Sequence, residues 1–207
     1  MIEGVLAAVR ELPAQVVPGE AGYPSLFLLV VFGSLVPVVP TGAVVSGAAA
    51  VAFHSSPPAL PLLLVFALAS LAAFLGDLTL YWLGLRGERS EIGARWLGWL
   101  RSRAAPDRLA VARRKLDERG VTVLVLSRLV PAGRIPVMVA CLVSRMPMGR
   151  FVRGAAPAAL AWTVTYQLIG VLGGALFPEP WQGVAAAVAL TLLVGAAPSV
   201  WQRLRPA

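Results

Sequence analysis

The chain alternates between long apolar stretches and shorter polar ones. Five apolar segments stand out, at residues 24–53, 59–85, 121–143, 154–177 and 184–201. A helix that crosses a bilayer needs about 20 apolar residues, because each residue advances it by about 1.5 Å. The second, fourth and fifth segments approach or exceed that length with few helix breakers at their centres. They predict about three full transmembrane helices.

Proline and glycine interrupt the other two segments. Leu35–Gly42 reads LVPVVPTG, and Leu129–Pro136 reads LVPAGRIP. Proline lacks the backbone N–H, and lipid offers no replacement partner for the carbonyl left unbonded. Each segment is therefore predicted to form a helix, a break and a second helix. The prolines expected to keep the two breaks open are Pro37, Pro40, Pro131 and Pro136.

The distribution of charge predicts which side of the membrane each segment faces. Residues 86–120 hold ten Lys or Arg against five Asp or Glu, which predicts a basic cytoplasmic loop. Three more arginines follow the third segment: Arg145, Arg150 and Arg153. With positive charge at both ends, segment 121–143 is predicted to enter and leave from the cytoplasmic side as a re-entrant hairpin.

The first broken segment is predicted to enter from the opposite face. The residues before it contain Glu3, Glu11 and Glu20 against Arg10, which favours the outer side. Two opposed re-entrant hairpins, each followed by a full span, are typical of an inverted repeat with a site near the midplane. The first 20 residues are predicted to form an amphipathic surface helix.

Composition supports one all-α integral membrane domain over residues 1–207. The sequence is 58% hydrophobic and 14% charged, against roughly 25% charged in soluble domains. The net charge is +8, but the basic residues cluster beside apolar runs, which favours lipid headgroups over nucleic acid as partners. Cys141 is the single cysteine, so we expect it to be a small buried side chain without a disulfide. We expect no metal and no cofactor.

Two arginines in segment 121–143 require a chemical explanation. Arg128 and Arg134 stay charged, and an arginine at bilayer depth costs at least about 2.5 kcal/mol. Asp77 is the only acidic residue within an apolar segment and is a candidate counter-ion. Guanidinium groups form bidentate hydrogen bonds with phosphate, and helix ends at the break add N–H donors. These residues, with Pro131 and Gly133, therefore form the predicted binding site for an anionic lipid headgroup.

Simpler roles stay open for the same residues. Arg128 and Arg134 are also consistent with structural ion pairs to Asp77, or with side chains that extend to the membrane surface. The aromatic residues near the ends of spans, Tyr81, Trp82 and Trp162, are interpreted as interfacial anchors. The glycines of the fourth segment are expected to permit close helix packing. These glycines are Gly170, Gly173 and Gly174.

Three stretches of the sequence resemble motifs of a known family. Phe74–Gly87 is similar to a G-D-x-x-x-Y-x-x-G pattern, and Ser127–Arg134 is similar to an R-x-x-P-x-x-R hairpin. Ser144–Phe151 resembles the M-x-x-x-x-F continuation. Together they resemble the DedA family, also called the VTT domain or SNARE-associated Golgi protein family, with a core at about 24–177. The resemblance implies a lipid transporter that recycles undecaprenyl phosphate or scrambles phospholipids, often using the proton motive force.

The chain departs from that family pattern at the first hairpin. Members usually carry an E-N-x-x-P-x-x-P-x-E arrangement there. The corresponding residues in this chain are Gly33, Ser34, Pro37, Pro40 and Gly42, none of which is a carboxylate. A proton relay in a membrane needs a titratable side chain, so loss of coupling, passive scrambling and transport of a different lipid all remain open.

The expected function is translocation of a phosphate-bearing lipid across the bilayer. The alternatives are a proton- or ion-coupled exporter of small solutes and a non-catalytic membrane assembly factor. An enzyme is not expected, because one His, one Cys and one intramembrane Asp supply neither a nucleophile with its base nor a metal cluster. The arginine-rich, alanine-rich composition is typical of GC-rich bacterial genomes, so a multi-pass protein of the bacterial plasma membrane is expected. The sequence does not indicate the oligomeric state.

Overall fold

A computed structural model provides the structure of the chain. It describes residues 22–35, 40–87, 95, 98, 110–111, 114, 116, 118, 121–129, 133–177, 179, 181–191 and 193. The predicted N-terminal surface helix and most of the basic loop at 86–120 lie outside these residues. The chain divides into two compact units, residues 1–73 with 163–207, and residues 74–162.

All regular structure within the described ranges is helical, as predicted. The helices are α2 (Gly22–Leu35), α3 (Thr41–Phe53), α4 (Ala59–Gly87), α7 (Val121–Leu129), α8 (Arg134–Val143), α9 (Met148–Leu176) and a further helix at Trp181–Thr191. Both interrupted segments form two helices each, since five residues separate α2 from α3 and four residues separate α7 from α8. The predicted re-entrant path of each pair across a bilayer stays a prediction.

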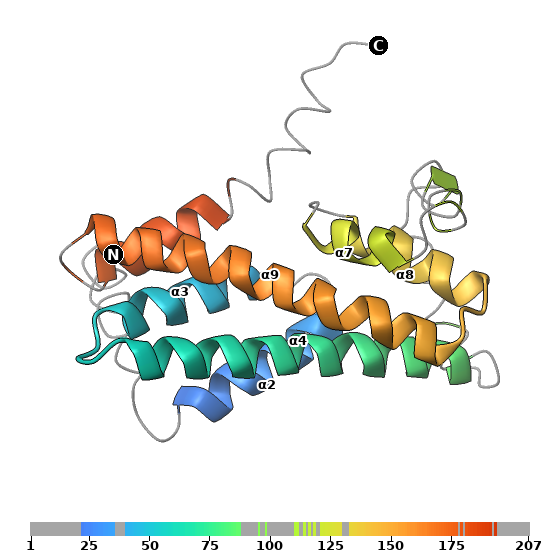
Figure 1. The fold of residues 1–207 in the computed structure, drawn as a ribbon, viewed down its shortest axis with the longest axis horizontal. Helices are drawn as coiled ribbons and strands as arrows, with labels where there is room; N and C mark the ends of the chain where they lie inside the picture. The colour runs from blue at the N-terminus through green and yellow to red at the C-terminus, as the bar shows by residue number, and fades with distance from the viewer. Residues whose placement is uncertain are drawn as a thin grey trace, which may run out of the picture. The chain divides into compact units, whose positions relative to one another are not determined.

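Among the described residues, two helices are long and apolar enough to cross a membrane. These are Ala59–Arg86 of α4, with 28 residues, and Met148–Leu176 of α9, with 29 residues (Figure 1). At the α-helical rise each extends for about 40 Å, which exceeds the roughly 30 Å of hydrocarbon in a bilayer. The third predicted span, 184–201, is described only through helix Trp181–Thr191 and residue 193.

The surface of α9 has the pattern expected of a helix that faces lipid. Large aliphatic side chains are exposed at every fourth position, and small ones are buried on the other side. The exposed series is Leu160, Val164, Leu168, Leu172 and Leu176. The buried residues include Ala155, Ala158 and Ala159. A row of leucines toward water would be costly, whereas lipid chains accommodate it, and small residues allow close helix contact.

In the unit formed by residues 1–73 and 163–207, α3 and α9 pack closely through small residues. A Cβ atom at Gly170 would collide with the backbone oxygen of Ser46 and lie 2.7 Å from the Cβ of Ala49. The Ser46 hydroxyl also donates a hydrogen bond of 2.9 Å to the carbonyl oxygen of Tyr166. The glycines of α9 therefore serve close packing, as the sequence predicted.

In the unit formed by residues 74–162, Tyr81 connects α4 to the end of α8. Its side chain is fully buried, its hydroxyl donates to the carbonyl oxygen of Met146, and its ring stacks on Phe151 with 4.0 Å between centroids. The interpretation of Tyr81 as an interfacial anchor was therefore wrong. Its apolar ring fills the core, and its hydroxyl satisfies a buried carbonyl group.

The end of α8 is closed by a left-handed turn. Arg145 has φ of 47°, and the N–H groups of Arg145 and Met146 donate to the carbonyl oxygens of Leu142 and Cys141. This is the hydrogen-bond pattern of a Schellman motif, in which glycine usually occupies the left-handed position. The turn directs the chain from α8 toward the start of α9.

Candidate functional site

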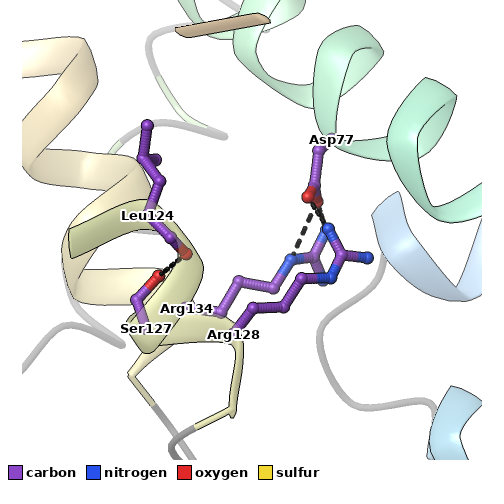
Figure 2. A network of polar contacts seen from close by, with 5 residues as sticks. All are labelled: Asp77, Leu124, Ser127, Arg128 and Arg134. Atoms are coloured by element: carbon purple, nitrogen blue, oxygen red, sulfur yellow. Dashed lines mark hydrogen bonds and ion pairs between the residues drawn. The ribbon is translucent and has the colours of Figure 1, made fainter. Parts of the chain in front are cut away.

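Asp77 is a buried carboxylate in the long helix α4. Its side chain is 8% exposed, and leucines, alanines and aromatic residues supply most of the helix around it. A buried carboxylate without a partner would be strongly unfavourable in these surroundings. Its position on α4 directs it toward two cations from other helices (Figure 2).

Arg128 and Arg134 provide these cations from the two helices of the second broken segment. Arg134, the first residue of α8, donates to Oδ1 of Asp77 from Nε at 3.0 Å and from Nη2 at 2.6 Å. Arg128, in the last turn of α7, forms an ion pair through Nη1 with Oδ2 of the same carboxylate. Figure 2 shows both guanidinium groups converging on Asp77. The structure thus brings together the three charged residues of the predicted site.

The two arginines have different environments. The Arg128 side chain is 5% exposed, whereas that of Arg134 is 25% exposed. Arg128 lies near the negative end of the α7 dipole, which favours a cation, and Arg134 lies at the positive end of α8, which disfavours one. The Asp77 carboxylate offsets this repulsion at Arg134, and any other anion at the same place would do the same.

Trp162 on α9 covers Arg128 from another side. The guanidinium carbon of Arg128 lies 5.1 Å from the centroid of the Trp162 ring, within the range of a cation–π interaction. Trp162 is 6% exposed, so its interpretation as an interfacial anchor was wrong. Sequence reasoning missed this residue because 34 positions separate it from Arg128, and no motif links the two.

A small, partly open pocket adjoins the three charged residues. Besides Asp77, Arg128 and Arg134 it is lined by Leu124, Ser127, Val137, Met138, Phe151, Ala155 and Ala158. Most of these residues are apolar. The one hydroxyl group among them, that of Ser127, donates to the carbonyl oxygen of Leu124 at 2.8 Å. The pocket has room for about one water molecule. A phosphate group would fit only if the guanidinium groups moved away from Asp77.

The remaining predicted site residues lie at helix ends or outside the described positions. Gly133 is the N-cap of α8, where no side chain caps the helix, and Pro136 is in the first turn. Proline is tolerated there because the first N–H groups of a helix have no internal acceptor. Pro40 occupies the same N-cap position before α3. Pro37 and Pro131 lie outside the described residues.

The described His, Cys, Asp and Glu side chains were compared with the requirements of a metal site. Among them, no three His, Cys, Asp or Glu side chains gather closely enough to hold a metal ion. Cys141 is buried and free, in agreement with the prediction of a small core side chain. The polar chemistry at this site is therefore that of one carboxylate and two guanidinium groups.

A known family matches the part of the chain that contains this site. Residues 24–172 match the VTT domain. The chain belongs to the VTT domain family. This confirms the resemblance to the DedA and SNARE-associated Golgi proteins, and the family is one of membrane proteins. The matched residues include most of α2, all of α3, α4, α7 and α8, and most of α9, and with them all three charged residues of the site. No curated protein and no solved structure matches the chain.

Proposed function

We propose that this VTT domain protein translocates a lipid with a phosphate headgroup across the bilayer. The observation that carries the proposal is the charge of the buried cluster. Two guanidinium groups and one carboxylate sum to +1, and Asp77 is the only acidic residue among the described residues that line the pocket. An excess cation in apolar surroundings is costly, and a visiting anion would lower that cost.

The chemistry of the arginines fits a phosphate group. A headgroup must lose much of its hydration to cross hydrocarbon, and charge-assisted hydrogen bonds from guanidinium groups replace that water. Arg128 and Arg134 come from two helices on either side of a break, so both can approach one phosphate. Asp77 takes the place of the phosphate when no lipid is bound, which keeps both arginines stable in the membrane.

The rest of the lipid does not need a polar path. The hydrocarbon tail stays in the bilayer, beside exposed leucine side chains such as those of α9, while the headgroup passes through the site. The protein acts without covalent chemistry and without a cofactor. Polyprenyl phosphates and phospholipids share the phosphate that the arginines recognise, and the plasma membrane of a bacterium contains both.

Lipid movement in vesicles that contain only this protein tests the proposal. Purified protein is reconstituted with lipids fluorescent on one acyl chain, and the fraction accessible to a membrane-impermeant quencher is followed over time. The wild type is expected to accelerate exchange, and Arg128→Ala and Arg134→Ala are expected to abolish the acceleration. Arg153→Ala, which removes an exposed arginine of α9, is the matched control and is expected to retain it. Normal exchange by both site variants would contradict the proposal, and an assembly factor would give no exchange with any variant.

A further inference from the structure

Within the part of the chain that the structure describes, three charged side chains line the pocket. α4 contributes the carboxylate of Asp77, α7 the guanidinium of Arg128, and α8 that of Arg134. The residues of α9 in the pocket wall are uncharged: Phe151, Ala155 and Ala158. With Asp77 ionised, the site carries +1, and an anion with one negative charge brings the whole assembly to zero.

We infer that Asp77 makes the site selective for headgroups with a single negative charge. The inference rests on the proposed function and adds the substrate class. Net charge is costly in an apolar environment, and the Asp77 side chain is only 8% exposed. A phosphodiester headgroup, which carries one charge, leaves the occupied site neutral. A dianionic phosphomonoester leaves it with −1 and places two like charges beside Asp77.

The inference makes phosphomonoesters and phosphodiesters respond differently to pH. A phosphomonoester loses its second proton at a pKa of about 6, so it is mainly monoanionic at pH 5 and dianionic at pH 8. A phosphodiester has one charge throughout this range. Movement of a monoester by the wild type is therefore expected to decrease as the pH rises, whereas movement of a diester is expected to stay constant.

A purely structural role for Asp77 has a different consequence. If the carboxylate served only to hold Arg128 and Arg134 in place, its loss would slow the movement of lipids with every kind of headgroup equally. The ratio between monoester and diester movement would then stay the same. The ratio, rather than either rate alone, therefore distinguishes selection by charge from support of the arginines.

The first experiment needs no substitution. Wild-type protein in vesicles is supplied with phosphatidic acid, a monoester, or phosphatidylglycerol, a diester, each with the same fluorescent acyl chain. Between pH 5 and pH 8 the monoester rate is expected to fall by roughly tenfold or more relative to the diester rate. The diester reports any effect of pH on the protein itself. Equal pH dependence of the two probes would overturn the inference and leave the proposed function intact. Movement of neither probe would contradict the proposed function and the inference with it.

The second experiment changes the charge of the site at nearly constant size. Asp77→Asn raises the site charge to +2, so at pH 8 it is expected to shift the rate ratio toward the monoester by roughly tenfold or more. Asp77→Glu keeps the charge and is expected to keep the wild-type ratio. An unchanged ratio in a folded Asp77→Asn protein would overturn the inference. If that variant does not fold, the wild-type pH profiles decide alone.

Discussion

Arg134 binds a single oxygen of Asp77 with two of its nitrogens, Nε at 3.0 Å and Nη2 at 2.6 Å. This arrangement leaves the second carboxylate oxygen to Arg128, with which it forms an ion pair. One carboxylate on α4 thereby holds the arginines of both α7 and α8. Loss of either oxygen contact would leave a guanidinium group in apolar surroundings without its carboxylate partner.

Removal of the carboxylate should destabilise the protein strongly. Asp77→Ala leaves two buried cations close to each other, and removal of one partner from a buried ion pair typically costs about 3–5 kcal/mol. Thermal unfolding in detergent is expected to show a large decrease in Tm. Glu118→Ala is the control, because Glu118 pairs with Arg114 at 3.8 Å on the exposed surface and should change stability by less than about 1 kcal/mol. Equal Tm values for the two variants would argue against a buried cluster.

Loss of one hydroxyl at Tyr81 should have a measurable cost. Tyr81→Phe keeps the stacked ring beside Phe151 but removes the donor to the Met146 carbonyl oxygen. A buried acceptor without its partner costs about 1–3 kcal/mol. Unfolding in detergent should show this loss, and Tyr81→Leu, which also removes the stacking, should lose more. A Tyr81→Phe protein as stable as the wild type would show that the hydroxyl contributes nothing at this position.

The glycines of α9 permit a comparison within one helix. Gly170→Ala should disrupt the packing against Ser46, because the new Cβ would meet a backbone oxygen that has little freedom to move. Gly149→Ala meets no atom within 4 Å and should stabilise the helix by up to about 1 kcal/mol. The two substitutions are thus expected to change Tm in opposite directions. A decrease of similar size for both would contradict the close contact between α3 and α9.

The buried cation–π contact between Trp162 and Arg128 should be stronger than the exposed one between Trp82 and Arg86. Trp82 is 41% exposed, and the guanidinium of Arg86 lies 4.2 Å from its ring centroid. Cation–π contacts contribute about 0.5–1 kcal/mol at exposed sites and about 2 kcal/mol when desolvated. Double-mutant cycles with Trp→Leu and Arg→Met substitutions in each pair measure the two coupling energies. A larger coupling for the exposed pair would show that burial does not strengthen the contact at the site.

Residue chemistry alone was sufficient to predict where the helices are interrupted. Pro40 precedes α3, and Gly133 and Pro136 mark the start of α8, because proline and glycine limit helix formation locally. The association of Asp77 with the arginines also followed from the sequence. Three charges in otherwise apolar segments have few other partners, so their pairing is close to a physical necessity.

Side-chain burial on the long helices could not be predicted in the same way. Apolar residues occur on every face of α4, so its pattern does not indicate which side meets protein and which meets lipid. Tyr81 was therefore assigned to the membrane surface although it is a core residue. Similarly, α9 begins at Met148, before the predicted apolar segment at 154–177, because Arg150 and Arg153 are exposed and do not prevent helix formation.

The central claim is that a lipid phosphate binds to Arg128 and Arg134, and photo-crosslinking tests it most directly. A lipid with a photoreactive group beside its phosphate is activated in vesicles containing the protein, and the labelled peptides are identified by mass spectrometry. We predict labelling of residues from α7 and α8, lost in the Arg128→Gln/Arg134→Gln double variant and retained in Arg153→Gln. Labelling that is absent from these helices, or that is unchanged in the folded double variant, would contradict the claim.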